Sequence, residues 1–309
     1  MTKFSEKVNQ MSDGDIIQFA DNKFLEVKEM LEELANGDIT GGIVKGVPGI
    51  GKSWFCSNIL TQLGVTYTDL LLSDYEQDKD SKEWLCTNLY KGKGPLIRKS
   101  DSRNWSIFAD LYANNKKGDV VMLDDNDEIM KDVTGLSLLM AATEHELGKD
   151  VNFTRANFNA ELRKYGVPAK FEYDGGVLIL TNFDMEGEVR KYADGTYKKE
   201  KKKPAHITRW EALLDRLDYI DMELDHPRLV RVYLENIIRN KNMYTEIKGY
   251  KANRLITKTE LEDMFTWVRK NQLELKTSLT FRTINELVRM ISLYDNWQDR
   301  AYRKLLKHL

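Results

Sequence analysis

The sequence predicts an α/β protein with a parallel five-stranded sheet and a helical domain at its C-terminal end. Two observations predict this class. Short apolar runs alternate with segments of helical periodicity up to roughly residue 225, which is typical of a parallel sheet covered by helices. Beyond that point only helical periodicity is found. We therefore expect an N-terminal helical segment at 1–39, a sheet domain at 40–224 and a helical domain at 225–309.

The expected strands are short and apolar. Residues 120–123 and 177–180 are continuous apolar runs of the kind that lies in the middle of a parallel sheet. The five expected strands cover residues 42–44, 67–72, 120–123, 177–180 and 219–222. The expected helices cover residues 24–34, 54–63, 105–113, 136–142, 229–238, 259–269 and 282–292. The candidate N-caps of the last two helices are Thr257 or Thr259, and Ser278 or Thr280.

Composition excludes several classes of protein. The 309 residues carry 47 Lys and Arg against 49 Asp and Glu, so no overall basic excess indicates a nucleic-acid binder, although a neutral total is compatible with a local basic patch. A hydrophobic content of 41% excludes a disordered chain, and no apolar run reaches the ~18 residues that span a bilayer. Because the N-terminus is polar, we do not expect it to act as a secretion signal, and Cys56 and Cys86 lack the spacing of a zinc site. We expect a cytoplasmic protein with reduced thiols.

A glycine-rich loop between the first expected strand and the next helix carries the most specific motif. Residues 46–53 read Gly-Val-Pro-Gly-Ile-Gly-Lys-Ser and match G-x-x-x-x-G-K-[ST] in full. Glycines let backbone N–H groups turn toward a phosphate, and the following helix directs its positive end at the same anion. Lys52 is expected to reach the β- and γ-phosphates of ATP, and Ser53 to bind Mg²⁺. The expected ATP-binding residues here are Gly46, Val47, Pro48, Gly49, Ile50, Gly51, Lys52, Ser53 and Trp54.

A pair of acids follows the strand expected at 120–123. An ATPase with such a loop needs an acid at the end of a neighbouring strand, and Asp124-Asp125 supply it. Asp124 is expected to hold Mg²⁺, and Asp125 to orient and polarise the attacking water. The competing interpretation is a solvated acidic turn, because Asp127 and Glu128 lie beside them.

The order of these motifs along the chain resembles the AAA+ ATPases, a family of P-loop NTPases. In that family a polar residue at the end of the fourth strand, called sensor 1, contacts the γ-phosphate and the water, and Asn182 matches it. An arginine in the following helix reaches the nucleotide of the neighbouring subunit. Arg216 in ALLDR matches this finger, and Arg209 is its rival. A helical lid carries the sensor 2 arginine, which Arg282 in SLTFRTINELVRM matches best.

The resemblance is narrower in two segments. KFEYDGGVLILTNFD and ALLDRLDYIDMEL look like AAA+ ATPases encoded by bacteriophages, and the resemblance covers most of residues 40–300. One departure is Asp125, where many members of the family carry Glu. Aspartate is one methylene shorter, so water activation is expected to be slow or to need a shifted geometry.

Each matched residue also has a structural interpretation. Asn182 suits the cap of a turn, and Arg282 suits a helix surface. Arg216 suits an ion pair with Asp215 or Asp218 on its own surface.

The resemblance implies a homo-oligomeric ring, most often of six subunits, that is driven by ATP and Mg²⁺. Two segments rich in Lys and Arg, residues 189–209 and 143–174, favour DNA as its substrate, in phage replication, recombination or packaging in the host cytoplasm. Two alternatives stay open. One is a protein-remodelling factor, for which Trp84-Leu85 and Tyr90 offer an aromatic pore loop. The other is a nucleotide-gated scaffold with slow turnover, which Asp125 suggests.

Overall fold

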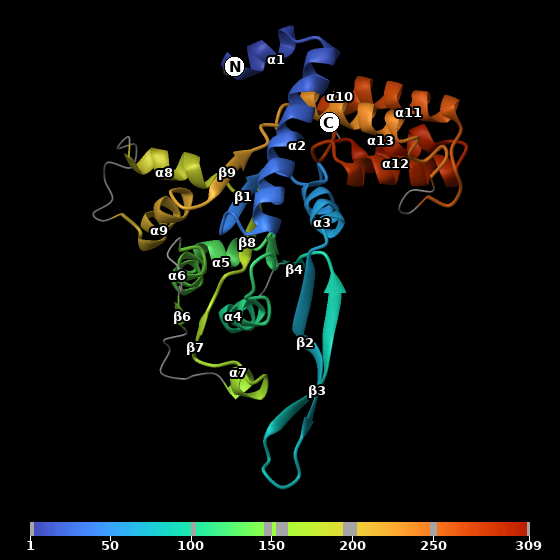
Figure 1. Ribbon diagram of the computed structural model, residues 1–309. Helices are drawn as coiled ribbons and strands as arrows, with labels where there is room; N and C mark the ends of the chain where they lie inside the picture. The colour runs from blue at the N-terminus through green and yellow to red at the C-terminus, as the bar shows by residue number, and fades with distance from the viewer. Residues whose placement is uncertain are drawn as a thin grey trace. The chain divides into compact units, whose positions relative to one another are not determined.

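The computed structural model describes residues 3–99, 103–144, 150–152, 160–193, 203–247 and 252–307 (Figure 1). The chain divides into two compact units. The sheet unit comprises Leu25–Lys45 and Lys52–Asp221, and the helical unit comprises Met1–Phe24, Gly46–Gly51 and Met222–Leu309. The three-part division expected at residues 1–39, 40–224 and 225–309 stays a prediction.

A five-stranded sheet forms the centre of the sheet unit, in the order β4-β5-β8-β1-β9. Every neighbouring pair is parallel, which confirms the predicted sheet. The central strands β5 and β8 are buried along their whole length, as their apolar runs predict. The strands are β1 (Gly41–Lys45), β4 (Leu96–Lys99), β5 (Val120–Asp124), β8 (Gly176–Thr181) and β9 (Asp218–Asp221).

Helices cover the two faces of this sheet. The helices of the sheet unit are α2 (Asp13–Asn36, from Leu25 onward), α3 (Lys52–Gln62), α4 (Asn104–Ala113), α5 (Asp127–Lys131), α6 (Val133–Ala142), α7 (Ala160–Lys164), α8 (Met185–Ala193) and α9 (Ala205–Leu214). On one face, Met30 and Leu34 of α2 lie over Gly42 and Gly176, where an added Cβ would come within 2.4 and 2.5 Å of them. These glycines therefore let the helix approach β1 and β8 closely.

The opposite face carries the main hydrophobic core of the sheet unit. Side chains alternate between the faces of a strand, so the residues after Gly42 and Gly176 point away from α2. Ile43 and Val177 join a buried cluster with α4 and α6, to which Phe108 and Leu139 belong. A short antiparallel pair, β6 (Asp150–Asn152) and β7 (Lys170–Glu172), supplies Val151 and Phe171 to the same cluster.

The strand predicted at 67–72 does not belong to the five-stranded sheet, and this prediction was wrong. Its residues lie in β2 (Thr66–Gln77), which pairs antiparallel with β3 (Trp84–Lys93) in a separate hairpin. The hairpin extends from the rest of the sheet unit (Figure 1). Pairing across residues 78–83 closes only a short loop, which costs little entropy. Strand β4, which was not predicted, is instead the fifth strand of the sheet and lies beside β5.

A buried ion pair fixes the root of this hairpin. Arg98 of β4 donates two hydrogen bonds to the carboxylate of Asp69 in β2 and two to that of Asp110 in α4, at 2.7–2.9 Å. Burial raises the pKa of Asp110 to about 6, against the opposing attraction of Arg98. The polar side chain of Arg98 thus lies inside the fold because two carboxylates bind it there.

The helical unit contains the helices predicted at 229–238, 259–269 and 282–292. Its elements are α1 (Lys3–Gln10), the start of α2, α10 (Pro227–Asn240), α11 (Lys258–Asn271), the 3₁₀ turn η1 (Gln272–Glu274), α12 (Phe281–Leu293) and α13 (Trp297–Leu305). Thr257 caps α11 in a capping box with Glu260, and Thr280 caps α12. Phe24 of α2 stacks on Tyr233 of α10, with ring centroids 5.0 Å apart.

Candidate functional site

In the sheet unit, three of the predicted site residues form a continuous chain of hydrogen bonds. Lys52, the first residue of α3, donates from Nζ to Asn182 Oδ1 at 2.8 Å. Asn182 follows β8 and donates from Nδ2 to Asp125 Oδ1, also at 2.8 Å. Because β8 lies between β1 and β5, a side chain at the end of β8 can reach residues that follow either neighbour. The structure therefore brings together the lysine, the polar residue and the second acid that the sequence predicted.

Lys52 sits in an enclosed environment, with its side chain only 6% exposed. Burial lowers the pKa of its ammonium below the usual value, although the nearby carboxylates of Asp125 and Asp124 oppose this shift. A buried ammonium needs anionic or polar partners. An anionic ligand beside Lys52 would supply one and favour its charged form.

The second pair of predicted residues also meets. Ser53 donates from Oγ to Asp124 Oδ1 at 2.7 Å, and Asp124 is 3% exposed at the end of β5. Lys99 Nζ lies 3.0 Å from the other carboxylate oxygen of Asp124. Lys99 was not predicted as a site residue, because it ends β4, which was not among the predicted strands.

The hydroxyl of Ser53 and the carboxylate of Asp124 are adjacent oxygen donors from two different elements, which is the ligand type that Mg²⁺ takes. Among the residues that the structure describes, there is no group of three or more His, Cys, Asp or Glu side chains placed to hold a metal ion. Mg²⁺ in phosphate-transfer sites is bound by one or two carboxylates together with substrate phosphates, and it keeps several waters. The donor set of Ser53 and Asp124 fits such an ion.

Asp125 adopts a backbone conformation that accounts for its residue type. Its φ is 52°, in the left-handed region, and its N–H donates to Leu180 O at 3.0 Å. Asp and Asn are enriched in this region, whereas longer side chains are disfavoured there. The turn after β5 therefore favours Asp over the Glu that the resemblance to AAA+ ATPases implies.

In the helical unit, the glycine-rich loop is held against the start of α12. Gly49 and Gly51 have φ values of 76° and 99°, and Gly49 O accepts a 3.0 Å hydrogen bond from Phe281 N. A Cβ at Gly49 would lie 2.8 Å from Thr280 Cβ. The loop thus needs glycine for its backbone angles and for this close approach. Arg282, the predicted sensor 2, directly follows Phe281 in α12 and has an exposed side chain.

The remaining loop residues differ in their exposure to solvent. Gly46 and Ile50 are buried, and a Cβ at Gly46 would lie 3.1 Å from Met222 Cβ. Val47 is half-buried and Pro48 is exposed. Trp54, the third residue of α3, is 62% exposed.

The two candidate finger arginines are held against α6. Arg216 donates to Met140 O at 3.0 Å and lies 3.4 Å from Glu144 Oε1, and Arg209 donates to Ser137 Oγ at 2.9 Å. Arg216 thus pairs with Glu144. A role for either arginine in a neighbouring subunit stays a prediction.

The two basic segments are only partly described. Residues 145–149, 153–159 and 194–202 lie outside the described residues. Within the described part of 189–209, three basic residues pair with acids: Arg190 with Glu186, Lys191 with Glu188 and Lys203 with Glu211. In the other segment, Lys164 Nζ lies 4.9 Å from the centre of the Trp84 ring on the hairpin.

A second cluster of charged residues lies at the same end of the sheet and was missed. Lys45, the last residue of β1, binds Asp221 Oδ2 at 2.7 Å and Asp184 Oδ1 at 2.9 Å. Burial acts to lower the pKa of Lys45, but these two hydrogen bonds raise it above its ordinary value. Lys45 and Asp221 are the last residues of β1 and β9, and Asp184 follows β8. The charged residues at the ends of the predicted strands were therefore the signal in the sequence.

Comparison with known proteins identifies a sequence relative and a distant structural neighbour. An uncharacterised 36.7 kDa protein from the nrdC–mobD intergenic region of Enterobacteria phage T4 is 23% identical over 282 residues, which is 91% of this chain and 73% of that protein. The crystal structure of NtrX from Brucella abortus superposes with a TM-score of 0.38 at 12% identity, and it covers 89% of this chain. The chain spans 52% of the NtrX chain. No family model matches the sequence.

The chain therefore resembles a phage protein at low identity. Among the described residues, no helix has the length and apolar character to cross a membrane.

Proposed function

We propose that this protein binds and hydrolyses ATP with Mg²⁺ and works as an oligomeric AAA+ motor on DNA. The observation that carries the proposal is the hydrogen-bonded chain from Lys52 through Asn182 to Asp125, beside the Ser53–Asp124 pair. Lys52 and Ser53 are the last two residues of a complete phosphate-loop motif after β1. The acids lie at the end of β5, and Asn182 follows β8. These residue types come together at the carboxyl ends of the parallel strands. This arrangement supports phosphoryl-transfer chemistry more strongly than the loop motif alone.

Each residue has a distinct role in the proposed reaction. Lys52 binds the β- and γ-phosphates and balances charge that moves onto the leaving group, while the loop N–H groups bind the phosphates. Ser53 and Asp124 would hold Mg²⁺, which supplies charge neutralisation between the phosphates. Asp125 orients and polarises the attacking water. Asn182 fixes the position of Asp125 and Lys52 relative to each other, so that the water and the γ-phosphate meet in line.

The AAA+ assignment adds a ring and a finger to this chemistry. In the proposed ring, Arg216 leaves Glu144 and reaches the nucleotide of the adjacent subunit, with Arg209 as the rival. Arg282 acts as sensor 2 from a helical lid. The hydrogen bond between Gly49 O and Phe281 N supports a connection between the start of α12 and the phosphate loop.

A second candidate function is protein remodelling, and the hairpin favours it. Trp84, Leu85 and Tyr90 of β3 are 42%, 52% and 44% exposed. Such exposed apolar side chains are typical of surfaces that contact other proteins. Stimulation of ATP hydrolysis separates the two functions, because DNA should stimulate a DNA motor and an unfolded protein should stimulate a remodelling factor.

The central test is nucleotide binding and phosphate release by the full chain. We expect Mg²⁺-dependent ATP hydrolysis that falls at least ~100-fold in Lys52→Ala, because a buried charge that stabilises the transition state is lost. Lys28→Ala is the matched control. It removes a lysine that is 47% exposed and pairs with Glu32 on the surface of α2, so its activity should equal that of the wild type. Absence of ATP or GTP binding by the wild type in the presence of Mg²⁺ contradicts the proposal, as does full activity of Lys52→Ala.

A further inference from the structure

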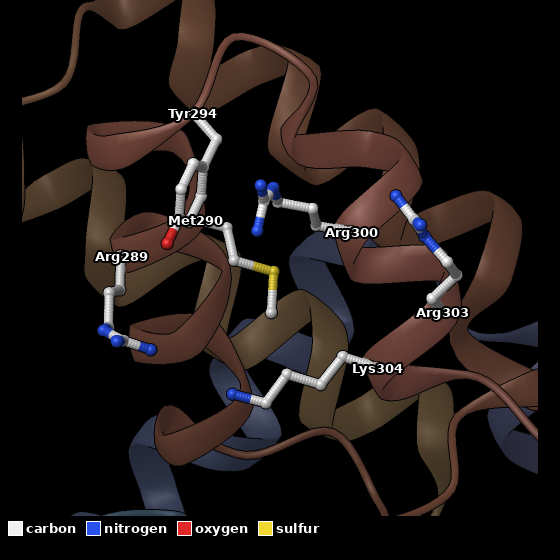
Figure 2. A pocket seen from close by; sticks show the side chains of 6 residues that line it. All are labelled: Arg289, Met290, Tyr294, Arg300, Arg303 and Lys304. Atoms are coloured by element: carbon white, nitrogen blue, oxygen red, sulfur yellow. The ribbon is translucent and has the colours of Figure 1, made fainter.

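The helical unit contains a cationic pocket between α12 and α13 (Figure 2). The cavity measures about 390 Å³. Its lining residues are Arg289 and Met290 of α12, Tyr294 directly after that helix, and Arg300, Arg303 and Lys304 of α13. Four cationic side chains therefore surround a hollow whose apolar wall is formed by Met290 and Tyr294.

The positive charge of this pocket exceeds the negative charge that faces it. Glu286 of α12 lies 2.9 Å from Lys304 Nζ and 3.5 Å from Arg289 Nη1, so one carboxylate serves two cations. Neither Arg300 nor Arg303 forms an ion pair with a carboxylate of any residue that the structure describes. The pocket thus keeps guanidinium groups that an anionic ligand can bind without breaking an existing ion pair.

The two arginines without a carboxylate are oriented by weaker contacts. Arg300 donates from Nε to Asn296 Oδ1 at 3.3 Å, and its guanidinium carbon lies 3.7 Å from the centre of the Tyr294 ring. Arg303 donates from Nε to the carbonyl of Asp299 at 3.2 Å. Among the residues that the structure describes, the terminal nitrogens of both side chains have no hydrogen-bond partner. Arg300 and Tyr294 together form a stacked planar pair at the side of the pocket.

We propose that this cationic pocket binds the phosphodiester backbone of a nucleic acid strand. Guanidinium groups bind phosphate oxygens in a bidentate manner, and Arg300, Arg303 and Arg289 surround one hollow from two helices. The Tyr294–Arg300 stack offers a planar surface of the kind on which bases stack. An acidic peptide would bind the arginine side chains but would not stack on Tyr294 and Arg300. A nucleic acid can make both kinds of contact and therefore fits the pocket better. This inference depends on the proposed function at one point, because the proposed function names DNA as the substrate.

The test measures binding of a fluorescein-labelled single-stranded oligothymidylate to the full chain by anisotropy, over a range of salt concentrations. In Arg300→Gln/Arg303→Gln we expect at least ~10-fold weaker binding and a salt slope smaller by about 1.4, since each lost single-strand phosphate contact removes about 0.7. The matched control is Lys258→Gln/Lys270→Gln, which removes the same charge from exposed positions of α11. It should bind like the wild type. Tyr294→Leu should weaken binding about 5- to 100-fold through lost stacking, with an unchanged salt slope.

Competition identifies the ligand class. An unlabelled duplex and poly-glutamate are titrated against the labelled strand, and inorganic phosphate serves as the probe for a free anion. Displacement by poly-glutamate at the same charge concentration as DNA overturns the proposal in favour of an acidic peptide. Equal loss of binding in the pocket variant and the α11 control overturns it too, and so does absence of DNA binding by the wild type.

Mg²⁺-ATP binding is measured on the same samples, which keeps the two proposals separable. A wild type that binds ATP but no DNA leaves the ATPase proposal standing and removes the pocket. A wild type that binds DNA through Arg300 and Arg303 but takes up no ATP supports the pocket proposal and contradicts the ATPase proposal. In the pocket variant we expect hydrolysis without DNA to be unchanged and stimulation by DNA to be lost.

Discussion

Lys52 Nζ and Asn182 Oδ1 are joined by a hydrogen bond of 2.8 Å, which links the start of α3 to the end of β8. The other side of the same amide donates to Asp125. A carboxamide has one acceptor atom and one donor group, and here the acceptor faces a cation and the donor faces an anion. Neither Asp nor Ala at this position can make both contacts.

Asn182→Ala and Asn182→Asp should therefore both lower the turnover of ATP, for different reasons. Alanine removes the positioning of Lys52 and Asp125, and we expect turnover to fall ~10²-fold while ATP affinity changes much less. Aspartate keeps the shape but places a negative charge beside Asp125, so ATP affinity should fall as well. Binding titrations and phosphate-release assays on both variants separate the effects. Wild-type turnover in Asn182→Ala would show that Asn182 only caps a turn.

The left-handed backbone of Asp125 leads to a prediction about this acid. Asparagine tolerates a φ of 52°, so Asp125→Asn should fold with unchanged thermal stability and lose hydrolysis at least ~100-fold, because its carboxylate is gone. Asp125→Glu keeps the charge in a residue that the backbone disfavours. We expect its thermal midpoint to drop by the equivalent of ~1 kcal/mol, with part of the hydrolysis retained. If Glu proves as stable as Asp, the turn does not select the residue.

The sequence predicted the central strands and the site residues because their signals are local. Residues 120–123 and 177–180 are apolar throughout, and the phosphate-loop motif fixes Lys52 and Ser53 by spacing alone. Strand β4 gave no such signal, because two of its four residues are Arg98 and Lys99. Arg98 is drawn inside by Asp69 and Asp110, which lie 29 and 12 positions away in the chain. Hydrophobic periodicity does not predict contacts between residues that lie so far apart in the chain.

The error over β2 has a related cause. Leu70-Leu71-Leu72 reads as a strand buried on both faces, but Leu72 is 61% exposed and the strand pairs with its neighbour in a hairpin. Pairing partners depend on which edges are free in three dimensions, and an apolar run does not specify them. Because Lys99 lies on the missed strand, its contact with Asp124 was missed too.

The glycine-rich loop permits a test that separates close packing from backbone strain. Gly49→Ala places a Cβ 2.8 Å from Thr280 Cβ at a φ of 76°, so it combines a clash with strain. Gly64→Ala is the matched control, since Gly64 has a φ of 85° and no atom within 4 Å of the added Cβ. We expect both variants to lose ~1 kcal/mol of stability from strain, and Gly49→Ala to lose about 1–3 kcal/mol more from overpacking. Equal shifts in thermal midpoint would show that the loop moves aside from α12.

The proposed finger predicts that two inactive chains restore activity together. An Arg216→Ala chain keeps an intact phosphate loop, and a Lys52→Ala chain keeps an intact finger. Mixing them should recover part of the ATPase activity, because an arginine finger is worth ~10³–10⁵ in rate and works across the subunit boundary. The same mixture with Arg209→Ala in place of Arg216→Ala shows which arginine serves. If no ratio of either pair restores activity, the site is not shared between subunits.

The buried ion pair at the root of the hairpin predicts an unusual dependence of stability on pH. Burial raises the pKa of Asp110 from 3.8 to about 6, so the folded protein holds a proton there more tightly than the unfolded chain does. The stability from this group is complete below about pH 4 and is lost as the pH rises through about 6, by at most ~3 kcal/mol.

Asp110→Asn removes the titration and keeps the shape of the side chain. The stability difference between the wild type and this variant, measured by thermal midpoints from pH 4 to 7, should therefore shift against the wild type as the pH rises. Asp38→Asn removes an exposed acid 4.0 Å from Lys117 and serves as the control for loss of a surface carboxylate. A difference that shifts in favour of the wild type would mean that Arg98 outweighs burial and lowers the pKa of Asp110.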